Sequence, residues 1–133
     1  MNRFNFQYSS GLIIVTVIIP GIISGSPFEY VLALDTGSTK TILQPSSILQ
    51  LGYSEKDKTK DVGITTGTKT EKGYELKIEN LHCLGYNWNS PNIVVKQLPL
   101  SLYYIDGLLG LDFFRSINKK LTIDFENAEI QVN

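Results

Sequence analysis

The segment Phe28–Ser38, with the sequence FEYVLALDTGS, is the stretch that most constrains the fold of this chain. Its first part, Phe28–Leu34, is an extended apolar run that predicts a strand. Its last part, Asp35–Ser38, is typical of a turn, and it puts a carboxylate at the tip of that strand. Taken alone, such a tetrapeptide is most simply a surface turn, so Asp35 gains a chemical role only if a second motif supports it.

A second motif begins seventy-three residues after Asp35, at the hydrophobic-hydrophobic-glycine sequence Leu108–Gly110. The residues directly after it, Leu111–Ile117, predict a short helix. Between the two motifs, Val62–Ile78 has two strand-like arms around a centre rich in Gly and Thr, which predicts a β-hairpin.

Length and composition exclude several classes of function. The 133 residues predict a single domain, residues 1–133. Twelve Lys and Arg against thirteen Asp and Glu give a net charge of −1, which argues against a nucleic-acid partner. One cysteine and one histidine are too few for a disulfide framework or a zinc cluster, so we expect no metal and no cofactor. Carboxylates and hydroxyls remain as the chemical groups.

The rest of the chain predicts short strands joined by turns, because it is rich in β-branched and aromatic residues and in glycine. A short helix is predicted from Pro45, which suits the first helical turn, to Gly52, which suits a C-terminal cap. Asn87–Asn92 (NWNSPN) predicts a loop, with its tryptophan packed over the core. Further strands are predicted at Lys40–Leu43, Ile93–Val95, Leu121–Phe125 and Glu129–Val132, the last two as a closing hairpin.

The apolar segment Gly11–Ile23 (GLIIVTVIIPGII) admits two interpretations. With Arg3 before it and small residues after it, it resembles a secretory signal peptide. Its β-branched composition and the break at Pro20 favour a strand buried on both faces, and the run is far shorter than the ~20 residues that cross a bilayer. We prefer the strand and expect a cytoplasmic protein, with export or membrane anchoring through residues 12–23 as the alternative.

The two motifs, in this order and separated by a hairpin, resemble those of the retropepsin-like aspartic proteases, the single-domain group that includes retroviral proteases and their bacterial and retrotransposon relatives. The continuation through LDFF at residues 111–114 is most similar to the cellular and bacterial members. The resemblance implies an all-β, mainly antiparallel fold with one or two short helices, a small closed barrel-like domain with a flap hairpin. It also implies that residues before the catalytic loop, including 1–26, are retained for the core.

The resemblance further implies a homodimeric aspartic endopeptidase that acts on extended peptides, with no nucleic acid and no membrane involved. Asp35 from each of two chains would share one proton and activate a water that attacks the peptide bond directly. In the catalytic loop, Thr36 would hydrogen-bond across the dimer axis, Gly37 would allow close approach of the backbone, and Ser38 would donate to the outer oxygen of Asp35. Flap residues expected to bind substrate are Ile64, Thr66, Gly67 and Thr68, and the expected scaffold residues are Leu108, Leu109 and Gly110.

Three features depart from the retroviral pattern or leave it open. Retroviral members pair a charged residue after the aspartate motif with an arginine after the second motif, whereas Thr39 and Leu111 stand at those places here. The twenty-three residues after Gly110 leave open how the dimer is sealed. Candidate second acids for a site within one chain are Asp106, Asp112 and Asp124, of which Asp112 is expected in the first turn of the short helix.

A second function is compatible with the same motifs. A retropepsin-like chain without a competent cleft would be a catalytically silent peptide-binding or assembly module, because a motif alone does not guarantee catalysis.

Overall fold

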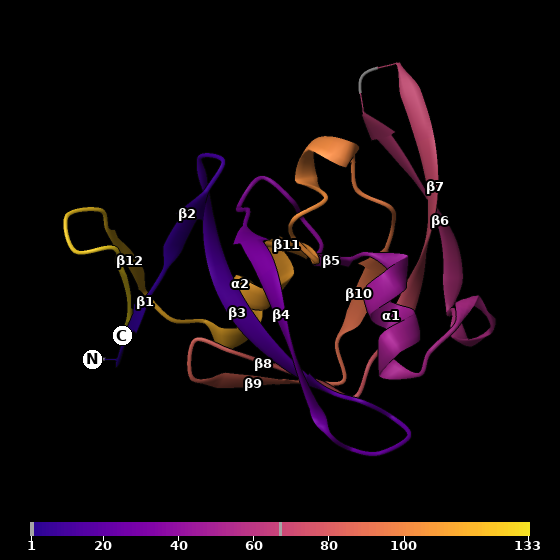
Figure 1. Ribbon diagram of the computed structural model, residues 1–133, viewed down its shortest axis with the longest axis horizontal. Coiled ribbons are helices and arrows are strands. Elements are labelled where there is room, and N and C mark those ends of the chain that lie inside the picture. The colour runs from indigo at the N-terminus through magenta and orange to yellow at the C-terminus, as the bar shows by residue number, and fades with distance from the viewer. Residues whose placement is uncertain (1, 67) are drawn as a thin grey trace.

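The computed structural model describes residues 2–66 and 68–133, and within them the chain is mainly β (Figure 1). The helices are α1 (Pro45–Leu51) and α2 (Leu111–Ile117), with 3₁₀ turns η1 (Glu55–Asp57) and η2 (Leu100–Leu102). The strands are β1 (Asn2–Asn5), β2 (Gln7–Ser9), β3 (Leu12–Pro20), β4 (Pro27–Leu34), β5 (Ile42–Leu43), β6 (Lys60–Thr66), β7 (Lys69–Lys77), β8 (Asn80–Cys83), β9 (Tyr86–Asn89), β10 (Asn92–Val95), β11 (Gly107–Leu109), β12 (Leu121–Asp124) and β13 (Glu129–Val132).

The main sheet is a curled half-barrel with the order β6-β7-β10-β5-β11-β4-β3-β8-β9, and β2 adds to β3. Most neighbours are antiparallel, but β10 runs parallel to β5, and β11 runs parallel to β4, with Leu109 opposite Leu34. The pair β4 and β11 positions the candidate site. Parallel strands end at the same edge of a sheet, so the residues that follow these two strands emerge side by side. The expected all-β, mainly antiparallel class with one or two short helices is confirmed.

A second sheet joins the two ends of the chain. Strand β1 pairs with β13, with Phe4 opposite Ile130, and β13 pairs with β12. Figure 1 shows both termini at the same side of the molecule, away from the β6–β7 hairpin. The terminal strands of this chain therefore pair with each other within one protomer.

The segment Leu12–Pro20 is a strand, as we expected, and forms β3 in the main sheet. Val15, Val17 and Ile19 on one face are buried in the core. The expected burial on both faces is wrong, because Thr16 on the other face is exposed and Ile14 and Ile18 beside it are only half-buried. Removal of the first 26 residues would take β3 and its pairing with β4 out of this sheet. In the part of the chain that the structure describes, no helix has the length and apolar character to cross a membrane.

Local sequence signals place both helices correctly. Helix α1 begins at Pro45 and is capped by Gly52, whose φ of 100° lies in the left-handed region that glycine favours. Helix α2 has the predicted bounds and carries Asp112 in its first turn, as expected. The α2 side chain of Phe113 is fully buried and meets Trp88 edge to face, with ring centroids 5.8 Å apart.

The loop predicted over Asn87–Asn92 is wrong in its first half, because Tyr86–Asn89 form strand β9. This strand is joined to β8 by Leu84 and Gly85, both with positive φ, which gives a tight two-residue hairpin. The asparagines of β9 face solvent and hydrogen-bond each other, while Trp88 packs against the core. Tertiary pairing thus overrides the turn preference of asparagine.

We expect Gly107→Ala to lower the free energy of unfolding by about 3 kcal/mol. A Cβ at Gly107 would overlap the backbone carbonyl of Ile42 on the adjacent strand β5, and backbone cannot move aside as a flexible side chain can. Urea denaturation measures the loss. Gly63→Ala is the matched control, because a Cβ at Gly63 would meet only the Thr70 methyl group, at 3.5 Å, and equal losses in the two variants would contradict the argument.

The thiol of Cys83 should resist alkylation in the folded protein. Cys83 is buried, and burial raises the pKa of its thiol to about 12, so the reactive thiolate is scarce near pH 8. Iodoacetamide labelling followed by mass spectrometry should show little modification in buffer and complete modification in denaturant. Rapid labelling of the folded protein at pH 8 would contradict this burial.

Candidate active site

The loop Asp35–Ser38 leaves the end of β4 and is held by backbone hydrogen bonds. The Asp35 N–H donates to the carbonyl of Leu109 on the parallel strand β11 (3.0 Å), and the Ser38 N–H donates to the Asp35 carbonyl (3.1 Å). The Gly37 N–H donates to Oδ1 of the Asp35 carboxylate (3.0 Å). The carboxylate is half-buried, so it is oriented by the loop and still reachable from solvent.

The two residues that flank Gly37 differ in their surroundings. Thr36 is exposed at the tip of the loop. The hydroxyl of Ser38 donates to the carbonyl of Lys40 (2.7 Å), which differs from the expected bond to the Asp35 carboxylate. Ser38 therefore stabilises the loop's own backbone, and the hydrogen bond that orients the carboxylate within the chain comes from the Gly37 N–H.

The second motif lies directly beneath the first. Leu109 is fully buried, and Gly110 lies so close to the segment after β4 that a Cβ there would meet the Lys40 carbonyl at 2.6 Å and the Ser38 carbonyl oxygen at 2.8 Å. The Leu111 N–H donates to that same Ser38 oxygen (2.8 Å). This close approach explains why glycine ends the motif.

A buried side-chain pair, Thr41 and Asp112, locks the two motifs together. The fully buried Thr41 hydroxyl accepts a hydrogen bond from the Gly110 N–H (3.1 Å) and donates to Oδ1 of Asp112 (2.7 Å). Oδ2 of Asp112 accepts from the Thr41 N–H (3.0 Å). This network joins the segment after β4 to helix α2. It lies close to Thr39 and Leu111, which stand where the retroviral pattern has an ion pair. Our sequence reasoning missed Thr41, although a threonine four residues after Gly37 was visible.

The three candidate second acids all have structural partners. Asp112 belongs to the network just described. Asp106 accepts a hydrogen bond from the Val31 N–H (2.8 Å), and its own N–H donates to the Val31 carbonyl. Asp124 closes the turn of the β12–β13 hairpin, where two hydrogen bonds from Asn127 lower the pKa of its carboxyl group. None of these contacts brings a second carboxylate to Asp35.

Asp35 opens into a hollow of about 440 Å³. Its lining includes Leu108, which points out of β11 into the hollow while Leu109 points into the core. The loop after β10 supplies the opposite wall. The apolar members of that wall are Leu98, Pro99 and Leu102, and Lys96 lies beside them. The hollow thus combines a carboxylate with an apolar wall.

The β6–β7 hairpin is the predicted flap. Its strands pair from Lys60 opposite Glu75 to Thr66 opposite Lys69. The predicted substrate-binding residues Ile64 and Thr66 lie on β6, and Thr68 is exposed in the turn, whereas Gly67 lies outside the described residues. At the base of the flap, a Cβ on Gly73 would meet the Val95 carbonyl oxygen at 2.8 Å, so the hairpin lies tightly against β10 there.

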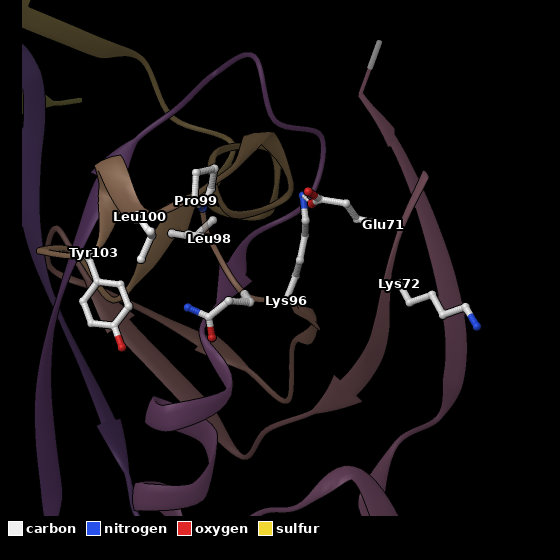
Figure 2. Close-up of a pocket in the computed structure, with 8 residues that line it drawn as sticks. Glu71, Lys72, Lys96, Leu98, Pro99, Leu100 and Tyr103 are labelled. Atoms are coloured by element: carbon white, nitrogen blue, oxygen red, sulfur yellow. Dashed lines mark ion pairs between the residues drawn. The ribbon is translucent and has the colours of Figure 1, made fainter. Parts of the chain in front are cut away.

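Charged side chains connect the flap to the rest of the site. Glu75 on β7 is almost fully buried and is balanced by Lys40 (3.8 Å) and Lys60 (3.4 Å). Farther along β7, Glu71 forms an ion pair with Lys96 (2.6 Å), as Figure 2 shows. Among the described residues, no group of His, Cys, Asp and Glu has the arrangement of a metal site.

Comparisons with known proteins agree with this geometry. The family model described as aspartyl protease matches residues 19–113, a range that contains the Asp35–Ser38 loop, the β6–β7 hairpin and the second motif. No curated protein sequence matches the chain significantly.

Two solved structures have a similar fold. A retropepsin-like aspartic protease from Rickettsia conorii superimposes with a TM-score of 0.71 at 14% identity, over 98% of this chain and 89% of that one. The protease of EIAV, in complex with the inhibitor HBY-793, gives a TM-score of 0.59 at 18% identity, over 87% of this chain and 98% of that one. The fold is thus retropepsin-like, and because the family match spans well over half of the sequence, the chain belongs to the aspartyl protease family.

Proposed function

We propose that this chain is an aspartic endopeptidase whose active unit is a homodimer, with residues 1–133 as one catalytic domain. The observation that carries the proposal is the position of Asp35, half-buried at an apolar hollow, with its carboxylate held by the Gly37 N–H in a chain of the aspartyl protease family. The described part of one protomer brings a single such carboxylate to the hollow, so a second protomer must supply its partner.

The chemistry follows from two Asp35 carboxylates held close together. Because both cannot be ionised cheaply at that separation, they share one proton. The ionised member accepts a proton from a water whose oxygen attacks the peptide carbonyl carbon, and the protonated member donates to the carbonyl oxygen. Collapse of the resulting diol breaks the C–N bond, and the amine leaves with a proton. No covalent intermediate with the protein forms.

The exposed tip of the loop is where two protomers would meet. Thr36 is exposed there, which suits a hydrogen bond across the dimer axis. The terminal strands β1 and β13 pair with each other within one protomer. They are therefore not free to form a sheet with the terminal strands of a second protomer. The catalytic loops therefore carry more of the dimer contact in this proposal, with the outer edges of β1 and β12 as a secondary surface.

The substrate in this proposal is an extended peptide. The flap supplies an adjacent strand pair for main-chain hydrogen bonds, and such bonds do not depend on sequence. Preference must then come from the hollows beside Asp35. Leu98, Leu102 and Leu108 favour apolar side chains next to the cut bond.

Replacement of Asp35 by Asn should abolish cleavage of a peptide library, with a loss of roughly a thousandfold or more, because the amide can neither accept the water proton nor hold the shared one. Mass spectrometry of the products, with both proteins assayed from about pH 4 to 7, measures this loss.

The control for Asp35→Asn is Glu126→Gln, which changes an exposed charge in the β12–β13 turn and should leave cleavage unchanged. Activity that persists in Asp35→Asn would rule out the aspartic mechanism. A well-folded dimer of the unchanged protein that cuts no peptide would favour the silent binding module instead.

Thr41 has a positioning role in this proposal, because its hydroxyl fixes the second motif beneath the catalytic loop. Thr41→Val keeps the shape but leaves the Gly110 N–H and an Asp112 oxygen without that partner, which should cost about 2 kcal/mol of stability. The loosened loop should lower kcat about tenfold with KM nearly unchanged, because substrate contacts are retained.

Thr41→Ser retains the hydroxyl and should restore kcat, which a purely steric role of the threonine methyl group would not allow. Thermal denaturation and steady-state kinetics of the two variants, measured side by side, test this role. An unchanged kcat in a folded Thr41→Val protein would contradict it.

A further inference from the structure

Lys96 is a buried cation on the rigid wall of the cleft. It directly follows β10, its N–H donates to the Leu43 carbonyl (3.1 Å), and its side chain is 9% exposed. Among the hollows that it borders are the one that contains Asp35 and a second of about 520 Å³ beside it. A lysine is rarely buried to this degree unless its charge is balanced.

The charge of Lys96 is balanced from the flap. Oε2 of Glu71 lies 2.6 Å from the Lys96 ammonium nitrogen, and the Glu71 side chain is 43% exposed. Figure 2 shows the two side chains extended toward each other across the space between β7 and the cleft wall. The anion is thus on the hairpin that must accommodate the substrate, whereas the cation is on the fixed side.

The second hollow suits a side chain with an apolar stem and a charged end. Its walls include Leu98, Pro99 and Leu100, with Lys96 at the boundary to the Asp35 hollow. An ammonium group has three N–H donors, so Lys96 can bind a second carboxylate while it retains Glu71, or can exchange one for the other as the flap adjusts. A glutamate has the two methylenes and the carboxylate that such walls and such a cation accommodate.

The other buried charge of the site does not offer this opportunity. Glu75 is surrounded by Lys40, Lys60 and the amide of Asn92, all from the protein itself. Lys72, next to Glu71 on β7, also lines the second hollow, but it is exposed and points away from Lys96 in Figure 2. Lys96 is therefore the cation best placed to bind a carboxylate of the substrate.

We propose that Lys96 is a specificity-determining residue that gives this cleft a preference for peptides with a glutamate within a few residues of the cut bond. This inference rests on the proposed peptidase function. Charge-assisted hydrogen bonds to a partly desolvated ammonium are strong enough for about a tenfold preference of glutamate over its neutral isostere glutamine.

The test compares glutamate with glutamine at each of the four positions on either side of the cut in one peptide that the protein cleaves. At about pH 6, where glutamate is ionised, one position should show roughly tenfold higher kcat/KM for glutamate. Lys96→Met should bring that ratio to about one, and Lys96→Arg should keep most of it. The matched control is Lys119→Met, an exposed lysine between α2 and β12 that lines neither hollow, and it should leave the ratio unchanged. The same peptides are titrated against the Asp35→Asn protein by fluorescence anisotropy.

The outcomes separate the inference from the function on which it rests. A ratio near one at every position, or a ratio that persists in Lys96→Met, overturns the inference and leaves the Glu71–Lys96 pair as a structural contact. If the protein cuts no peptide, the proposed function fails, and the anisotropy ratio still decides whether Lys96 selects glutamate.

Discussion

The Thr41 hydroxyl is the contact on which the arrangement of the site depends. Parallel pairing of β4 with β11 brings Asp35 and Gly110 to the same edge of the sheet, but pairing alone leaves both following segments free to diverge. The hydroxyl prevents this because it accepts from the Gly110 N–H and donates to Asp112, and so ties the loop after β4 to the first turn of α2. Because these groups are buried, loss of one partner leaves the others without a hydrogen bond and without water to replace it, which destabilises the fold. The hydrogen bonds of the network therefore depend on one another.

The resulting candidate site has a tightly packed base. Its base consists of backbone hydrogen bonds and close glycine contacts, which cannot shift without breaking the sheet. The flap is attached to that base at Gly73, where it lies against β10, and farther along through the ion pair of Glu71 with Lys96. The hairpin is therefore held at two places, neither of which involves Asp35. The terminal sheet closes the opposite side of the protomer through β1 and β13.

Elements with a strong local signal could be predicted from the sequence. Helix α1 has proline at its start and glycine in the left-handed region at its end, and the Val62–Ile78 hairpin has two alternating arms around a glycine-rich centre. Strand β9 could not be predicted, because its asparagines favour turns and only pairing with β8 keeps them extended. The hydrogen bond from the Ser38 hydroxyl to the Lys40 carbonyl could not be predicted either. From the sequence alone, the Asp35 carboxylate and the Lys40 carbonyl are both possible acceptors, and only the backbone conformation decides between them.

The sequence by itself determined the family and the position of the candidate carboxylate, because both depend on short motifs whose residue types are required by local geometry: an aspartate at a strand end, and a glycine where no Cβ fits. The tertiary structure alone decided which side chains surround that carboxylate. Thr41 and Asp112 are 71 residues apart in the sequence. Glu71 lies on β7, whereas Lys96 lies in the loop after β10. Neither pair therefore leaves a local pattern in the sequence. Such contacts form only when distant segments pack together. A buried charge or hydroxyl is costly unless it has a hydrogen-bond or ionic partner, and the tertiary fold decides which residue that partner is.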